Sequence, residues 1–349
     1  MNRRRAAWIG GAAALAGTAL AAGKIVARRE RRGEDPYADE DFAELPSEEI
    51  APVVSFDGTL LHVRAAGDPE RPALVFAHGF AVDMTTWHFQ WKELSKDYRC
   101  IVFDQRGHGR SGDAAGGDHS LASMGRDLKA VIDAAVPADR PVAVLGHSMG
   151  GMTLLALADE HPEMFERRIA AAVLADTAAA ELVRGAAGLL GLRLMAAAPN
   201  LGRRFASLMT REIVRTRVSR SDFAYMVARL TNFGPHASPK MVEYVVDLSM
   251  RSPVAVWTAG VTALMEMDLR YVIRHVRCPT LVIVGDLDRM TPPTSANVLK
   301  EELPDGRLVV LEGAGHMAPM ERHEQFDALV REFAADAFSR AARATEGAR

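Results

Sequence analysis

The chain has 349 residues, of which 48% are hydrophobic and 25% charged, and its formal net charge is −3. This length and apolar content are enough for a large hydrophobic core, so the sequence predicts a globular protein. The near-neutral charge argues against nucleic acid as a partner, the two cysteines give no disulfide framework, and the chain holds none of the paired His or Cys motifs typical of metal sites.

The first 32 residues differ in kind from the rest. Three arginines at positions 3–5 precede an uncharged stretch over residues 6–23, and more arginines follow over 28–32. Eighteen uncharged residues are just enough to cross a bilayer, although alanine and glycine make insertion marginal. We therefore expect a single-pass or interfacial membrane anchor and a membrane-associated protein. A cleaved export signal, with residues 19–21 as an A-x-A site, and a cytosolic helix are the alternatives.

The acidic, proline-containing stretch over residues 33–49 is interpreted as a linker to one domain over residues 50–343. That domain begins with an expected hairpin over 53–56 and 60–66, turning at Asp57-Gly58. Short apolar runs, typical of buried strands, then alternate with helical patterns; the runs occupy residues 73–77, 100–103, 142–145, 170–174, 281–284 and 308–311. The α/β pattern predicts a mostly parallel sheet of eight strands with helices on both faces.

A long interruption over about residues 179–270 separates the fourth and fifth of these runs. Its pattern is helical, and it is too long to be a plain loop, so we expect a helical cap insertion over the candidate site. Seven methionines lie between Met195 and Met267, together with many aromatic and leucine side chains. Because thioethers suit adaptable apolar pockets, the cap predicts a small substrate with a hydrophobic acyl or alkyl group.

Residues 146–151 read Gly-His-Ser-Met-Gly-Gly at a predicted junction between a strand and a helix. This is the nucleophile-elbow pattern G-x-S-x-G. Glycines at Gly146 and Gly150 allow the sharp turn because they carry no Cβ atom. The turn lifts the Ser148 hydroxyl above the sheet and places the Met149 N–H at the positive end of a helix, where it can stabilise an oxyanion.

A serine hydroxyl attacks a carbonyl only when a base removes its proton, and that base needs a third group to orient it. Candidates follow later predicted strands. Asp286 and Asp288 come after the strand over 281–284, Asp176 comes after the strand over 170–174, and His316 lies in a glycine-flanked loop after the strand over 308–311. The carboxyl ends of parallel strands meet at one edge of a sheet, so these side chains should converge there.

Taken together, these motifs resemble the α/β-hydrolase fold superfamily, over about residues 50–337. The closest likeness is to serine hydrolases of the esterase, lipase and cofactor-free haloperoxidase type. The motifs that carry it, in chain order, are His78-Gly79-Phe80, Asp104-Gln105-Arg106-Gly107-His108-Gly109-Arg110-Ser111, Gly146-His147-Ser148-Met149-Gly150-Gly151, Gly285-x-x-Asp288-x-x-x-Pro292 and Gly313-x-Gly315-His316.

The resemblance implies a role for each matching residue. Ser148 is then the nucleophile, His316 the general base and Asp288 the group that orients the imidazole, with the N–H groups of Phe80 and Met149 as the oxyanion hole. The family's glycine-to-aspartate spacing favours Asp288 over Asp286. Some members place the acid where Asp176 stands, which keeps that residue as a weaker candidate.

The activity that the resemblance implies is hydrolysis of carboxylic esters through an acyl-enzyme on Ser148, with no cofactor and no metal. The same triad also serves cofactor-free perhydrolases or haloperoxidases and hydrolases of carbon–carbon bonds. A low-turnover, ligand-binding member of the fold is the alternative outside enzymes.

Residues 107–112 also satisfy the dinucleotide-binding pattern G-x-G-x-x-G after a predicted strand. In a dinucleotide fold the third glycine opens a helix directly. Here residues 113–118 have the composition of a loop, so the sequence disfavours a nucleotide site.

Overall fold

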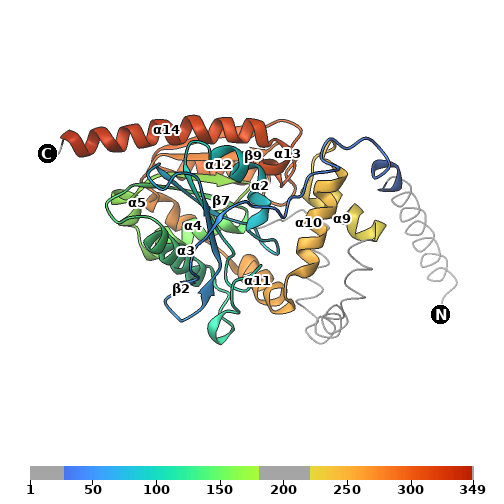
Figure 1. Ribbon diagram of the computed structural model, residues 1–349, viewed down its shortest axis with the longest axis horizontal. Coiled ribbons are helices and arrows are strands. Elements are labelled where there is room, and N and C mark those ends of the chain that lie inside the picture. Colours follow the sequence, from blue (N-terminus) through green and yellow to red (C-terminus); the bar gives the residue numbers. More distant parts are fainter. Residues whose placement is uncertain (1–26, 181–220, 348–349) are drawn as a thin grey trace, which may run out of the picture.

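A computed structural model describes residues 27–180 and 221–347 (Figure 1). Its centre is a sheet of eight strands in the order β1-β4-β6-β5-β7-β8-β9-β10. The strands are β1 (Glu48–Glu49), β4 (Val63–Ala66), β5 (Ala73–Ala77), β6 (Arg99–Phe103), β7 (Val142–His147), β8 (Ile169–Ala175), β9 (Thr280–Gly285) and β10 (Gly306–Leu311). Strands β5, β6, β7, β8, β9 and β10 run parallel to one another, while β4 pairs antiparallel with β6 and β1 pairs antiparallel with β4. This confirms the predicted fold class.

Helices cover both faces of this sheet, as the apolar strands require. Along β5, Val75 belongs to one hydrophobic cluster, while its neighbours Leu74 and Phe76 belong to the cluster on the opposite face. The first cluster includes residues of α3, α4 and α12, and the second includes residues of α2 and α14. The core helices are α2 (His88–Leu94), α3 (Leu121–Ala135), α4 (Met149–Glu160), α5 (Met164–Arg167), α12 (Pro293–Glu302), α13 (Ala318–Glu321) and α14 (His323–Gly347), with 3₁₀ turns η1 (Met84–Trp87), η2 (Ala115–Gly117) and η3 (Arg270–His275).

The predicted hairpin divides into two parts. β2 (Val53–Val54) and β3 (Leu60–Leu61) form a separate two-stranded sheet, and the turn between them uses Gly58 at φ 90°. The next strand, β4, leaves this hairpin and joins the main sheet against β6. The eighth strand is therefore β1, which pairs with β4. It belongs to the stretch over residues 33–49 that was interpreted as a linker.

Residues 33–49 are not a linker in the structure. Phe42 and Leu45 are each only 1% exposed, and the indole N–H of Trp91 donates a hydrogen bond to the Pro46 carbonyl at 3.0 Å. Acidic residues dominate the composition of this stretch, so its composition did not predict that a few apolar side chains are buried against distant parts of the chain. We name residues 27–46 the N-terminal arm.

The prediction of a membrane-associated protein is corrected. Along the described ranges 27–180 and 221–347, no helix combines the length and apolar character needed to cross a bilayer. The uncharged stretch over 6–23, on which both the anchor and the export signal rested, lies outside those ranges. Of the arginines that were expected to flank a membrane segment, Arg31 forms ion pairs at 2.8 Å with Asp222 and Glu243.

The described part of the cap insertion consists of α9 (Asp222–Asn232), α10 (Pro239–Arg251) and α11 (Val254–Glu266). The two ends of the insertion meet beside the sheet, where Ala180 pairs with Asp268 and the Leu269 N–H donates to the Ala179 carbonyl at 2.7 Å. Tyr225 of α9 and Val242 of α10 are buried in a third hydrophobic cluster, which they share with Phe42 of the arm. The arm therefore lies between the cap helices and the core.

Candidate active site

Ser148 stands at the turn between β7 and α4, in a backbone conformation that non-glycine residues rarely adopt. Its φ is 52° and its ψ is −119°, a combination that costs energy and persists only where the surroundings enforce it. Two hydrogen bonds hold the residue there. Its N–H donates to the Ala175 carbonyl at 2.9 Å, and the Thr177 hydroxyl donates to its carbonyl at 2.7 Å.

The glycines of the elbow allow backbone segments to approach closely. A Cβ atom on Gly150 would lie 2.1 Å from the Ala77 carbonyl oxygen, and one on Gly146 would lie 2.4 Å from the Gly150 carbonyl oxygen. No side chain fits at such distances, so α4 can start directly above β5 and β7 only with glycine at these positions. The Ser148 side chain remains partly exposed while residues on both sides of it are buried.

His316 and Asp288 converge on this serine from two different loops. The His316 Nε2 atom lies 2.9 Å from the Ser148 Oγ atom, and the His316 Nδ1 atom lies 2.9 Å from Asp288 Oδ2. Because a carboxylate accepts from Nδ1–H, the Nε2 atom is left to accept the serine proton. Asp288 follows β9, His316 follows β10, and both side chains are buried.

Asp288 is held as a carboxylate. The N–H groups of Met290 and Thr291 donate to its Oδ1 at 2.8 and 3.0 Å, and the Thr291 hydroxyl donates to its Oδ2 at 2.6 Å. Burial acts to raise the pKa of Asp288, but the charge of His316 and the hydrogen bonds from His316 and Thr291 outweigh it and lower that pKa. The carboxylate therefore faces the imidazole in its charged form at neutral pH.

The two rival carboxyl groups have other partners. Asp286 accepts a hydrogen bond from the Gly313 N–H at 2.7 Å, which ties together the loops after β9 and β10. Asp176 lies fully buried after β8 and accepts from the Gly285 N–H at 2.9 Å and the Ala318 N–H at 3.0 Å. Burial and the nearby charge of Asp288 raise the pKa of Asp176 well above its ordinary value, which favours a neutral carboxyl there.

The two residues expected to supply an oxyanion hole come from separate segments at the same edge. Met149 is the first residue of α4, so its N–H takes no part in the helical hydrogen bonds. Phe80 follows β5, and its ring packs edge-on against Trp257 of α11, with 5.1 Å between ring centroids. A Cβ atom on Gly260 would lie 2.3 Å from the Phe80 ring, so the cap helix touches this loop directly.

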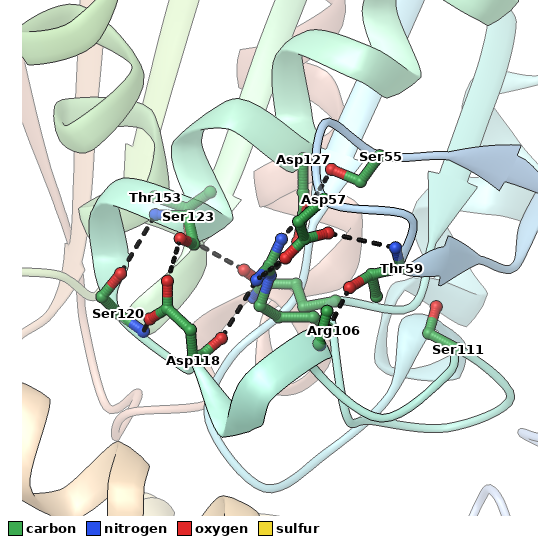
Figure 2. Close-up of polar contacts among 12 residues, drawn as sticks. Ser55, Asp57, Thr59, Arg106, Ser111, Asp118, Ser120, Ser123, Asp127 and Thr153 are labelled. Carbon is green, nitrogen blue, oxygen red and sulfur yellow. Dashed lines mark hydrogen bonds and ion pairs between the residues drawn. The ribbon is translucent and has the colours of Figure 1, made fainter.

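The loop after β6 contains a buried arginine, Arg106, that binds carboxylate and carbonyl groups of three other segments. Arg106 is fully buried, and Figure 2 shows its guanidinium among Asp57, Asp127 and Asp118. Its Nε and Nη2 atoms donate to the two carboxylate oxygens of Asp127 at 2.6 and 2.7 Å, and Nη1 donates to Asp57 at 2.9 Å and to the Asp118 carbonyl at 3.0 Å. The G-x-G-x-x-G pattern lies in this loop, and the next α-helix begins only at Leu121.

Two residues of the site, Thr291 and His147, were not predicted from the sequence. Thr291 supports Asp288, and the His147 Nε2 atom lies 2.7 Å from the His316 carbonyl oxygen. A hint for Thr291 exists in the Asp-x-x-Thr spacing, which suits a side chain that accepts from the backbone three residues on. Within the described ranges, no group of three or more His, Cys, Asp or Glu side chains gathers in a way that could hold a metal ion.

A strained serine above a mostly parallel sheet, within hydrogen-bond distance of a buried histidine and aspartate, defines the class of α/β-fold hydrolases. The sequence model of the alpha/beta hydrolase fold family matches residues 72–323, and the chain belongs to this family.

The comparisons also identify esterases and lactonases among similar proteins. The chain is 27% identical over 283 residues to 3-oxoadipate enol-lactonase 2 of Acinetobacter baylyi, and this alignment covers 79% of this chain and 96% of that protein. It is 26% identical over 285 residues to the pimeloyl-[acyl-carrier protein] methyl ester esterase of Vibrio campbellii, covering 79% and 99%. A solved esterase from Thermogutta terrifontis superimposes with a TM-score of 0.66 at 23% identity, over 84% of this chain and all of that one, and shows a shared fold.

Proposed function

We propose that the protein is a serine hydrolase that cleaves carboxylic esters with a hydrophobic acyl or alkyl group. The observation that carries the proposal is the hydrogen-bonded series in which Ser148 Oγ lies 2.9 Å from His316 Nε2 and His316 Nδ1 lies 2.9 Å from Asp288. Two relatives named above are an enol-lactonase and a methyl ester esterase, and both names state hydrolysis of an ester bond. This supports the same reaction class here.

In the first step the Ser148 oxygen bonds to the ester carbonyl carbon while its proton passes to His316 Nε2. The electron pair of the C=O double bond moves onto the carbonyl oxygen, where the N–H groups of Phe80 and Met149 stabilise the charge. When the tetrahedral intermediate collapses, the bond to the alcohol oxygen breaks and His316 gives its proton to the leaving alcohol.

The acyl-enzyme on Ser148 then reacts with water by the same sequence. His316 accepts a proton from the water as its oxygen attacks, and returns a proton to Ser148 Oγ as the acid leaves. Asp288 keeps its negative charge throughout and stabilises the imidazolium that forms twice in each cycle.

A fluorophosphonate probe and a panel of p-nitrophenyl esters test the proposal. The probe should label the wild type and the control variant Ser339→Ala, whose exposed serine lies on α14, but not Ser148→Ala. Catalytic efficiency, kcat/KM, should rise from acetate to octanoate esters because longer chains bury more apolar surface. Labelling of Ser148→Ala would refute the nucleophile, and a flat chain-length series would refute the hydrophobic substrate.

A further inference from the structure

Gln105 lies between the two segments that carry the proposed oxyanion donors. It follows Asp104 in the loop after β6, and its side chain is buried. The Nε2 atom donates to the His78 carbonyl at 2.6 Å, and the Oε1 atom accepts from the Thr153 hydroxyl at 2.8 Å. One amide group thus joins the loop after β5 to helix α4.

The first of these links fixes the loop that leads to Phe80. Besides the bond to the His78 carbonyl, the Gln105 backbone N–H donates to His78 Nε2 at 2.9 Å. This leaves the imidazole proton on Nδ1, which donates to the Gly79 carbonyl at 2.8 Å. Burial lowers the pKa of His78, so the neutral ring that these bonds require is the favoured form. Both the backbone and the side chain of His78 are therefore held by Gln105.

The second link reaches Met149 through one residue. Thr153 lies one helical turn after Met149 on α4, and its buried hydroxyl is 3.0 Å from the Met149 carbonyl oxygen as well as 2.8 Å from Gln105 Oε1. The His78 carbonyl can only accept, so the NH₂ group of the Gln105 amide faces it and the Oε1 atom faces the Thr153 hydroxyl. The first turn of α4, which begins with Met149, is thereby tied to the same amide.

We propose that Gln105 is a positioning residue that sets the spacing between the N–H groups of Phe80 and Met149. The inference rests on the proposed ester hydrolysis and adds to it a residue that touches neither substrate nor Ser148. Oxyanion donors act only at about 2.7–3.1 Å from the developing charge, so a small displacement weakens them. Such a loss is felt in the transition state more than in substrate binding, and it lowers kcat with little change in KM.

The main variant is Gln105→Leu, which removes both links at similar volume. Its matched control is Gln90→Leu. Gln90 is also a buried glutamine whose Nε2 donates to a backbone carbonyl, that of Pro319 at 2.9 Å, and to Asp327 at 2.7 Å. A second pair varies the other end of the link: Thr153→Val removes the hydroxyl, and Thr153→Ser keeps it. This pair keeps the proposal testable should Gln105→Leu fail to fold.

Two measurements on the full chain separate positioning from general damage. The first is kcat and KM with a p-nitrophenyl ester. The second is the affinity for an alkyl trifluoromethyl ketone. The Ser148 oxygen bonds to the carbonyl carbon of this ketone, the C=O electron pair moves to the ketone oxygen, and the serine proton moves to His316. This adduct carries the oxyanion that the substrate complex lacks.

We expect kcat and ketone affinity to fall together by about 10- to 100-fold in Gln105→Leu and Thr153→Val, with KM changed less than about 2-fold. Thr153→Ser should restore most of the loss, and Gln90→Leu should stay near the wild type. Unchanged kcat and ketone affinity in Gln105→Leu and Thr153→Val, or an equal fall in Gln90→Leu, would overturn the inference. Ser148→Ala run alongside distinguishes the two claims, because retained turnover in that variant would refute the proposed function itself.

Discussion

Replacing the buried Arg106 with leucine should lower the free energy of unfolding by about 3–5 kcal/mol, the range for breaking a buried ion pair. Leucine removes two hydrogen bonds to Asp127, at 2.6 and 2.7 Å, one to Asp57 at 2.9 Å and one to the Asp118 carbonyl at 3.0 Å. The Asp127 side chain is only 1% exposed, so water cannot replace the lost cation. Asp57 is 19% exposed and contributes the smaller share.

Arg126, which precedes Asp127 on α3, offers a matched control. Arg126 also donates two hydrogen bonds to one carboxylate, that of Glu160, at 2.9 and 2.7 Å. Here the two side chains are 40% and 28% exposed, so water screens the pair and solvates whichever partner remains. Arg126→Leu should therefore cost less than about 1 kcal/mol.

Urea unfolding at pH 7, with equal m-values required for a valid comparison, measures both changes. Adding Asp127→Asn to Arg106→Leu should recover part of the loss, because the uncompensated charge is then gone. Burial raises the pKa of Asp127 even beside Arg106; without the arginine the folded state binds a proton more readily still, so the deficit should grow as pH rises through that pKa. A cost for Arg106→Leu no larger than that for Arg126→Leu would refute this reasoning.

Two further predictions concern carboxyl groups. Asp288→Asn should lower kcat on p-nitrophenyl esters by about 10³–10⁴-fold. Asp176→Asn replaces a carboxyl group that is favoured as neutral, so its kcat should stay within about 10-fold of the wild type. The reverse ranking would make Asp176, and not Asp288, the residue that orients His316. Burial raises the pKa of Asp327 to about 7 from the ordinary 3.8, so between about pH 4 and 7 the folded state holds a proton that the unfolded chain has lost. The wild type should therefore lose up to about 4 kcal/mol of stability as pH rises through that window, and urea unfolding of Asp327→Asn should lack this slope; equal slopes would count against a buried neutral carboxyl.

The strands and the elbow could be predicted because their residues obey strong local constraints. β5 and β7 are apolar at nearly every position since helices cover both faces of the sheet. Gly146 and Gly150 stand where any Cβ atom would collide with backbone. Such positions tolerate few residue types, so their pattern is readable without knowledge of distant contacts.

The choice among three aspartates could not be made from local pattern alone. Asp176, Asp286 and Asp288 all follow the carboxyl ends of strands, and hydrophobic periodicity says nothing about where a loop side chain turns. In the structure Asp286 accepts from the Gly313 N–H and Asp288 faces His316. Two residues in one loop thus acquire different partners across a turn, which the Asp288 N–H closes by donating to the Gly285 carbonyl at 3.1 Å.

The packing of the N-terminal arm could not be predicted, for a related reason. Its charges dominate the composition, yet Phe42 packs at 5.3–5.6 Å between ring centroids against His88, Phe89 and Tyr244. Those three side chains belong to α2 and α10, which are about 45 and 200 residues further along the chain. An isolated phenylalanine in an acidic stretch carries no period, so its burial depends on surfaces that only the folded chain creates.

The loop after β6 shows how neighbouring residues in one motif take on separate tasks. Its polar side chains reach η1, the loop after β5 and α3. Asp104 accepts from the Met84 N–H of η1, and Arg106 donates to Asp127 of α3. In the loop after β5, the His78 carbonyl accepts from Gln105 and the Ala81 N–H donates to His108. Gln105 and Arg106 are adjacent, yet Gln105 contacts the loop after β5, at the edge of the sheet that carries the candidate site, and Arg106 contacts α3. Substitution of Gln105 should therefore change kcat more than stability, and substitution of Arg106 should change stability more than the kcat of the folded molecules. This opposition between two consecutive residues would not arise if the loop acted only as a single structural unit.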